Sequence, residues 1–227
     1  TMIRTALAAL ALVFPMTVSN TTSGAITLEL GVRGFNTVIS GYNPIVYAYD
    51  LIKNGHADAL FVGGADEMTD EIAQLGEGLI EGSPMIFLSS SEFAEKNNLT
   101  FTHELVDCSG GAYTKEDEAQ SLSRLMSTTV KSLQENGEIT DHSKITVTGI
   151  SDSHEKVEQE TSLYKNLLGQ ESLETKFPRA EIGDCLGASD IFSVIYSIVY
   201  LKENQDLAIV NNINYSNCLT SILVQKK

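Results

Sequence analysis

Residues 55–67 read Gly-His-Ala-Asp-Ala-Leu-Phe-Val-Gly-Gly-Ala-Asp-Glu, and this stretch decides the fold. Its short apolar run, residues 59–62, is stopped by Gly63 and Gly64, a pattern typical of a central strand that is covered on both faces. Before this run, apolar residues recur at helical spacing over residues 45–52, and Gly55 closes that helix. A helix followed directly by a buried strand predicts a layered α/β protein.

The same alternation of helices and short apolar strands continues on both sides of this stretch. In the first half, the pattern predicts strands over residues 35–40, 84–88 and 100–106, with a short helix over 92–96. In the second half it predicts helices over 122–133, 157–168 and 191–201, and strands over 145–148, 207–210 and 219–224.

The best internal boundary by composition is the glycine-containing and charged segment of residues 108–117. We therefore expect an N-terminal half over residues 1–110 and a C-terminal half over 118–227, packed together as one compact domain. The apolar run of residues 6–14 has the length and charge order of a secretory signal peptide, but it also resembles a buried first helix. No clean small-x-small cleavage site follows it, which favours the helix and a cytoplasmic protein.

Charge and cysteine content exclude several classes of function. The formal net charge is -15, from 30 acidic and 15 basic residues, and such a chain would repel a phosphate backbone, so nucleic acid is not an expected partner. The longest apolar run is too short to span a bilayer, so we expect no membrane partner. The cysteines Cys108, Cys185 and Cys218 form no CxxC pair and lack His residues at metal-ligand spacing, so no metal or other cofactor is expected.

Four motifs together resemble the β-ketoacyl-acyl-carrier-protein synthase family. Residues 31–34 read Gly-Val-Arg-Gly, residues 81–88 begin Glu-Gly-Ser-Pro, and residues 183–188 read Gly-Asp-Cys-Leu-Gly-Ala; the fourth motif is the stretch 55–67. The resemblance implies a thiolase-like fold with α-β-α-β-α layers. A complete synthase is considerably longer, so the first half is expected to be truncated.

The resemblance also implies positions for a catalytic thiol and two catalytic histidines, and none of these residues is present. The nucleophile position falls on Val38, and the second His falls on Asp184. The first His corresponds to the region of Thr148, Gly149, Ile150, Ser151 and Asp152, none of which is His. His154 lies close by as an alternative donor, but Ser153, His154 and Glu155 are typical of a solvated helix entry. The family's glycine-rich loop corresponds to residues 213–220, which contain no Gly.

A condensing enzyme needs a thiolate to carry the acyl group and donors to stabilise developing negative charge. Their joint loss predicts a non-catalytic subunit, similar to a chain-length factor, that forms a heterodimer with an active β-ketoacyl synthase in polyketide, polyene or fatty-acid-like biosynthesis. Acyl carrier proteins are acidic, so a carrier would reach this chain only indirectly, through the catalytic subunit.

The resemblance places the subunit interface or acyl tunnel at one segment of the first half. The candidates are Asn36, Thr37, Val38, Ile39, Tyr42, Pro44, Ile45 and Tyr47, although ordinary core packing explains the aromatic ones equally well. A second hypothesis is an acyltransferase or hydrolase whose nucleophile is Ser40 or Cys185, and a third is a stand-alone acyl-binding scaffold.

Overall fold

The computed structural model describes residues 21–112, 118–135, 145–201, 205–214 and 216–227. The chain divides into two compact units, Thr1–Ser40 and Gly41–Lys227. In the first unit, helix α2 (Thr21–Leu30) has no buried residue and is followed by Gly31 in the left-handed conformation, with φ of 64°. The apolar run of residues 6–14 lies outside the described residues.

The strand predicted over residues 35–40 is wrong. This segment has no regular secondary structure, and most of its side chains, including those of Phe35 and Val38, are exposed. A strand needs a neighbour for its backbone hydrogen bonds, and no described strand pairs with this segment. Its β-branched composition permits a strand, but without a neighbouring strand among the described residues the segment stays irregular.

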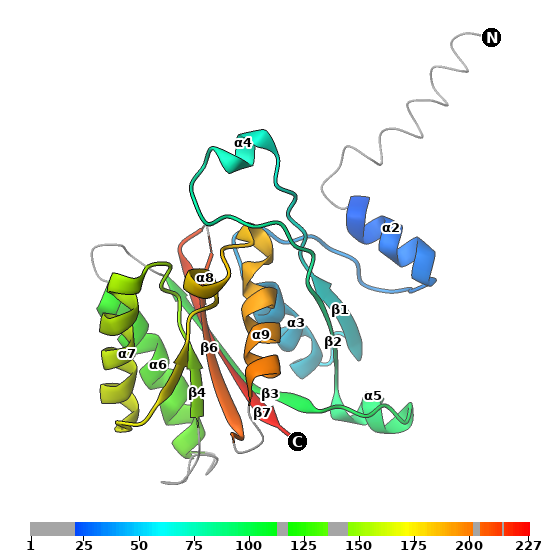
Figure 1. Ribbon diagram of the computed structural model, residues 1–227. Helices are drawn as coiled ribbons and strands as arrows, with labels where there is room; N and C mark the ends of the chain where they lie inside the picture. Colours follow the sequence, from blue (N-terminus) through cyan, green and yellow to red (C-terminus); the bar gives the residue numbers. More distant parts are fainter. Residues whose placement is uncertain (1–20, 113–117, 136–144, 202–204, 215) are drawn as a thin grey trace, which may run out of the picture. The chain divides into compact units, whose positions relative to one another are not determined.

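The second unit is built on a five-stranded mixed sheet with the order β3-β7-β6-β4-β5 (Figure 1). The strands are β3 (His103–Ala112), β4 (Ile145–Thr148), β5 (Glu174–Lys176), β6 (Leu207–Ile213) and β7 (Cys218–Lys226). Strand β7 runs antiparallel to both of its neighbours, whereas β6, β4 and β5 run parallel to one another. The carboxyl ends of β3, β4, β5 and β6 therefore meet at one edge of the sheet, where β7 begins.

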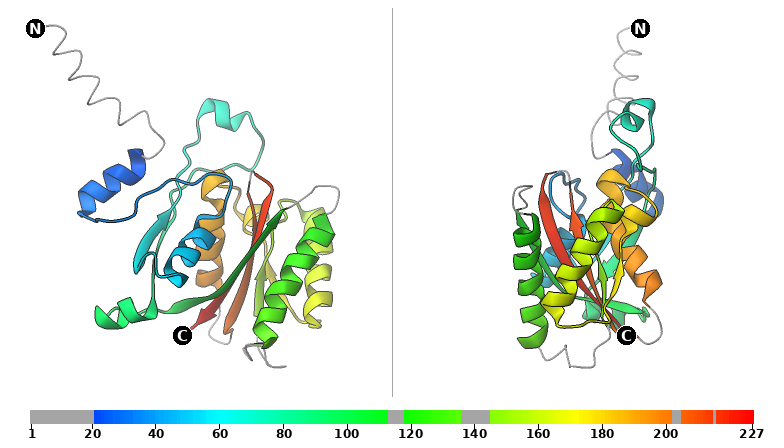
Figure 2. Two further views of the ribbon diagram at one scale, coloured as in Figure 1. Left: turned by 180° about the vertical axis from the view of Figure 1, so that it is seen from behind. Right: turned by 60° about the vertical axis from the view of Figure 1, so that its left-hand side comes forward.

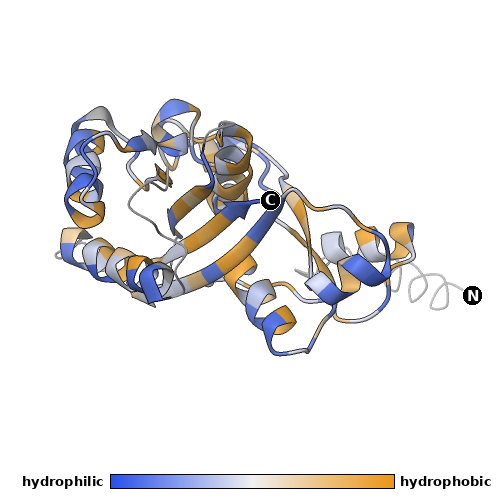
Figure 3. Cartoon of the chain, turned by 90° about the horizontal axis from the view of Figure 1, so that it is seen from below, coloured by the Kyte–Doolittle hydropathy of each residue, from blue (hydrophilic) through white to orange (hydrophobic). Residues whose placement is uncertain are grey.

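Helices cover both faces of this sheet (Figure 2). Helices α6 (Glu118–Glu135) and α7 (His154–Leu168) pack on one face, in a core that contains Met126, Tyr164 and Ile209. Helices α3 (Pro44–Lys53) and α9 (Ser189–Tyr200) pack on the other face, around Ile191 and Val210. Hydrophobic residues concentrate on the strands and on the sides of the helices that face them (Figure 3), as burial of an amphipathic helix on a sheet requires.

A second sheet, beyond α3 and α9, contains the strand that the opening stretch predicts. It pairs β1 (Ala59–Gly63) with β2 (Met85–Ser89) in an antiparallel hairpin. The prediction of a strand was correct, but the prediction of a central strand covered on both faces was wrong, because Phe61 is 48% exposed. The two-stranded sheet packs on α3 and α9 with one face. On its other face, Phe61, Met85 and Phe87 are about half-exposed and no described helix of the second unit covers them.

Short helices complete the described residues: α4 (Asp70–Ala73), α5 (Ser91–Lys96), α8 (Pro178–Glu181) and the 3-10 helix η3 (Leu186–Ala188). The layers of the second unit thus run helix, sheet, helix, sheet.

The expected boundary between the two halves, residues 108–117, begins inside a strand, because residues 108–112 end β3, which pairs with β7. Residues 113–117 are outside the described part of the chain. The division into halves at residues 110 and 118 stays a prediction.

Candidate functional site

The candidate site lies where the carboxyl ends of the large sheet's strands meet. Three loops come together there: residues 149–153 after β4, residues 183–188 before α9, and the turn between β6 and β7. The amino end of α3 joins them, because the Asn43 side chain caps this helix and also donates from Nδ2 to Thr220 Oγ1 of β7 at 2.9 Å. In α/β proteins this edge is where ligands and catalytic groups gather.

The loop after β4, where the family's first histidine is expected, has no space for a side chain at Gly149. A Cβ added there would lie 2.2 Å from the ring of Phe177 and 2.7 Å from the Glu160 carboxylate. The Gly149 amide donates to Lys176 O at 2.8 Å, which holds the backbone in place. An aromatic ring in a packed core cannot move aside without a cost, so Gly149 requires glycine.

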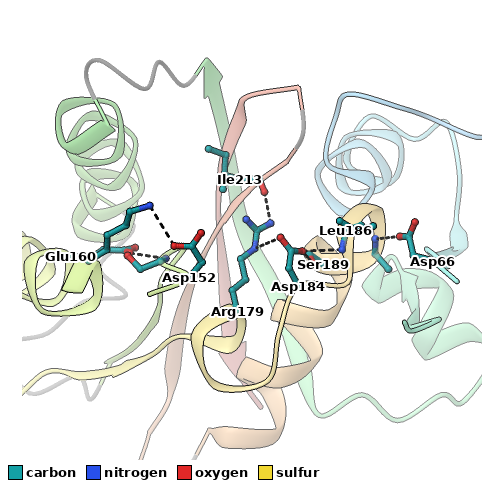
Figure 4. Close-up of polar contacts among 11 residues, drawn as sticks. Asp66, Asp152, Glu160, Arg179, Asp184, Leu186, Ser189 and Ile213 are labelled. Carbon is teal, nitrogen blue, oxygen red and sulfur yellow. Dashed lines mark hydrogen bonds and ion pairs between the residues drawn. The ribbon is translucent and has the colours of Figure 1, made fainter. Parts of the chain in front are cut away.

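Glu160 of α7 fixes the same loop. Its carboxylate accepts hydrogen bonds from the amides of Ile150 and Ser151, both at 2.9 Å, and from the hydroxyls of Ser151 and Tyr164. The Glu160 side chain is only 7% exposed, so these donors supply the pairing that a buried carboxylate needs. Figure 4 shows it pointing from α7 toward the loop.

The sequence contains a pattern that indicates a buried acid at Glu160. Residues Val157, Glu160, Tyr164 and Leu168 recur at helical spacing along one stripe of α7, so an acid stands on the apolar side of the predicted helix. The side chain of His154, at the start of α7, lies outside the described part of the chain.

Asp184, at the second histidine position, is held by its own turn. Its carboxylate accepts from the Leu186 amide at 2.9 Å and from the Ser189 hydroxyl. Its other oxygen lies 3.6 Å from Nε of Arg179, and the Arg179 guanidinium also donates to Ile213 O at 2.5 Å (Figure 4). The carboxylate thus caps the turn before α9, and a carboxylate cannot donate a hydrogen bond as a neutral His does.

The end of the stretch 55–67 and the turn around Asp184 lie against each other. The Asp66 carboxylate accepts from the Ala188 amide at 3.0 Å, and a Cβ on Gly64 would lie 3.0 Å from the Ala188 Cα. Burial raises the pKa of Asp66, although the Ala188 and Gly187 amides oppose this shift. Two motifs separated by more than a hundred residues therefore form one structural unit.

Asp190 is a second acid that the sequence reading did not single out. It lies in the first turn of α9 and is only 5% exposed. Burial raises the pKa of its carboxyl to about 6, opposed by the Arg179 guanidinium and assisted by Asp184. An acidic residue in the first turn of a helix is common, because the helix dipole stabilises negative charge there whether the side chain is exposed or buried. The position of Asp190 in the sequence therefore did not indicate that its carboxyl is buried.

The turn between β6 and β7 replaces the family's glycines with asparagines. Asn217 adopts the left-handed conformation with φ of 53°, which Asn tolerates better than most residues. Asn214 Oδ1 accepts from the amides of Ser216 and Cys218, both at 3.0 Å. An open pocket of about 330 Å³ adjoins this turn and is lined by Tyr42, Gly110, Gly111, Ala112, Ser216, Asn217 and Cys218.

The remaining interface and tunnel candidates fall in different environments. In the first unit, Asn36, Thr37, Val38 and Ser40 are exposed and Ile39 is half-buried. In the second unit, Ile45 is fully buried in the core beside α9, Pro44 and Tyr47 are half-buried, and Tyr42 is exposed.

The candidate replacement nucleophile Cys185 has an unfavourable setting. Its side chain is 1% exposed. Burial raises the pKa of the Cys185 thiol, and the nearby carboxylates of Asp184 and Asp66 raise it further. The reactive form of cysteine is the thiolate, and all three effects disfavour it. Within the described residues, no cluster of three or more His, Cys, Asp or Glu could hold a metal ion.

No protein-family model matches the sequence, and no curated protein is significantly similar to it. Solved structures do match. A β-ketoacyl synthase from Burkholderia phymatum STM815 superposes with a TM-score of 0.70 at 16% identity, covering 92% of this chain and 65% of that chain. The ishigamide ketosynthase/chain length factor superposes with a TM-score of 0.64 at 15% identity, covering 94% of this chain and 63% of that chain. The ketosynthase of bacillaene synthase module 1 from Bacillus amyloliquefaciens FZB42 superposes with a TM-score of 0.75 at 13% identity, covering 93% of this chain and 50% of that chain.

The chain has the thiolase-like fold of the β-ketoacyl synthases. This confirms the resemblance and the fold class predicted from the motifs. The chain spans 65% of the length of the first ketosynthases that it matches. None of the described helices is both long and apolar enough to cross a membrane.

Proposed function

We propose that this chain is a non-catalytic, chain-length-factor-like subunit that forms a heterodimer with an active β-ketoacyl synthase. The reaction served is polyketide, polyene or fatty-acid-like chain extension, in which the catalytic subunit carries the thiol and receives the acyl carrier protein. The proposal is supported by the ketosynthase-like fold and by the absence of Cys and His from the residues that the sequence motifs align with the family's catalytic positions.

The observation that carries the proposal is the packing at Gly149. The Phe177 ring occupies the space in which any side chain at this position would begin, so the loop cannot present an imidazole to a substrate from Gly149. Asp184 adds to this argument, because its carboxylate is bonded to the Leu186 amide and the Ser189 hydroxyl. Both positions are thus used for structural contacts.

The alternative nucleophiles have less support. Cys185 is buried and its thiol pKa is raised, and Ser40 is exposed without a hydrogen bond to a base among the described residues. An unactivated serine is a weak nucleophile. The stand-alone scaffold stays a competitor, and the oligomeric state separates it from the heterodimer.

Intact-mass analysis tests the absence of catalysis. The purified chain is incubated with malonyl- and acyl-loaded carrier protein, alone and together with a Cys-containing synthase. We expect an acyl adduct on the synthase and none on this chain. An adduct on this chain that disappears in Ser40→Ala or Cys185→Ser would establish the enzyme hypothesis instead.

Co-expression with a Cys-containing β-ketoacyl synthase from the same genome tests the heterodimer. We expect the two chains to elute together at equal stoichiometry in size-exclusion chromatography. Val38→Asp with Ile39→Asp should abolish the complex, since an unpaired charge buried at an interface is costly. Val199→Asp on α9, where the side chain is 70% exposed, is the control and should leave the complex intact. A stable wild-type monomer in the presence of the synthase would contradict the proposal.

A further inference from the structure

The open face of the β1–β2 hairpin is the largest unexplained apolar feature of the second unit. The register pairs Phe61 with Phe87 and Gly63 with Met85, and directly paired residues share one face of a sheet. Phe61, Met85 and Phe87 are 48%, 47% and 45% exposed. The two phenyl rings lie with centroids 5.0 Å apart, so they form one continuous apolar surface. We call these three residues the hairpin face.

The opposite face of the hairpin shows how such a surface is normally covered. There, Leu60, Val62, Ile86 and Leu88 pack into the core formed with α3 and α9. The large sheet is likewise covered on both faces by pairs of helices. The hairpin face is therefore the one sheet face in the second unit without a helical layer among the described residues, and the layer that fits it is an amphipathic helix.

Exposed acidic residues lie near both ends of the two strands. Asp58 immediately precedes β1 and Glu92 lies in the first turn of α5, directly after β2, and both are exposed. At the other end of the hairpin, Glu67 and Glu81 are exposed. Over residues 57–96, Lys96 is the only lysine or arginine. These acidic residues would repel a partner with acidic residues at the rim of its contact surface, and they would attract a partner with lysines or arginines there.

Helix α2 of the first unit does not meet this description. Its apolar residues Ile26 and Leu30 lie on one side of the helix and Leu28 lies on the opposite side, so they do not form one stripe. Helix α2 also contains no basic residue.

We propose that the hairpin face is a docking surface for an amphipathic helix of a second polypeptide, with leucine-like residues on its apolar side and lysines or arginines at its flanks. The apolar side covers Phe61 and Phe87, and the basic flanks meet Asp58 and Glu92. The hairpin face shares no residue with the heterodimer contact proposed at residues 36–39, so either proposal can fail without the other.

The test uses a labelled synthetic helical peptide of leucine and lysine with leucines at helical spacing, titrated with the full chain and followed by fluorescence anisotropy. Two peptides serve as controls: a scrambled peptide of the same composition, and a leucine/glutamate peptide of the same pattern. We expect saturable binding of the patterned leucine/lysine peptide alone, weakened by added salt.

Chain variants locate the binding. Phe61→Ser with Phe87→Ser should weaken binding at least about tenfold, because buried aromatic residues dominate such contacts. Asp58→Asn with Glu92→Gln should weaken it several-fold and reduce the salt dependence. Val199→Ser removes a more exposed apolar side chain on α9 and should leave binding unchanged. Circular dichroism checks that each variant is folded.

Three results would overturn the proposal: no saturable binding, equal binding of the scrambled or glutamate peptide, or equal binding by the Phe61/Phe87 double variant. Equal loss in Val199→Ser would also overturn it, since binding would then not depend on the hairpin face.

Discussion

The two sheets of this protein contain similarly apolar strands in different surroundings. In the five-stranded sheet, every residue of β6 from Leu207 to Asn212 is buried, because helices cover both faces and strands flank both edges. In the two-stranded sheet, only Val62 of β1 is buried. Neighbouring strands and helices therefore decide whether a strand is buried. The hydrophobicity of the strand's own residues allows burial but does not ensure it.

The largest expected difference is in core truncation. Ile209→Ala, at a fully buried position of β6, should lower the free energy of unfolding by about 4 kcal/mol through lost burial and the cavity left behind. Phe87→Ala on the hairpin face should lower it by less than about 1 kcal/mol, since half-exposed side chains gain less from folding. Urea denaturation measures both. Equal losses would show that the hairpin face is covered in solution.

The second prediction concerns the anchor of the loop after β4. Glu160→Ala leaves the buried amides of Ile150 and Ser151 without their acceptor and should cost about 3 kcal/mol. The exposed Glu158 on the same helix provides the matched control, and Glu158→Ala should change stability by less than about 0.5 kcal/mol. A small effect of Glu160→Ala would mean that water replaces the carboxylate without loss.

The third prediction is a pH dependence at Asp190. Its carboxyl pKa rises from 3.8 to about 6 on folding, mainly through burial. Between these values the unfolded chain ionises first, so stability falls as pH rises and stays low above pH 6. The loss is on the order of 2 to 3 kcal/mol. Asp190→Asn, which cannot ionise, should remove this contribution.

Urea denaturation at pH 4 and pH 7 compares wild type with Asp190→Asn. The variant should gain stability relative to wild type at the higher pH. An unchanged difference between the two chains at both pH values would show that Asp190 ionises normally in the folded protein.

The smallest predicted effect compares the two faces of the hairpin. Val62→Ala removes a side chain that packs toward α3 and α9 and should cost about 1 to 2 kcal/mol. Phe61→Ser on the other face should change stability by no more than about 0.5 kcal/mol. The reverse order would contradict the assignment of the inner and outer faces.

The elements of the second unit were predictable where periodicity was clear. Helices α6, α7 and α9 and strands β4, β6 and β7 follow the predicted segments closely, because each presents a complete apolar stripe or run. Residues 35–40 failed for a different reason: β-branched residues favour a strand, but no local pattern reveals whether a neighbouring strand exists.

The candidate site was predictable only in its absences. The motifs predict that Val38, the span from Gly149 to Asp152 and Asp184 correspond to catalytic positions, and none of these residues is Cys or His. The groups that organise the site, Glu160 and Arg179, were missed. The apolar stripe of α7 marks Glu160 as a buried acid, but residue order does not reveal its partners or those of Arg179, which are backbone atoms and carboxylates brought close by folding.

The contact between Gly149 and Phe177 also bears on attempts to engineer the chain. A substitution that places any side chain at position 149 would first have to displace an aromatic ring, so it carries a folding defect before it can add a functional group. Phe177 and Gly149 would have to change together, with Glu160 adjusting as well. The loop after β4 therefore accepts a new functional group at position 149 only as part of a multiple substitution.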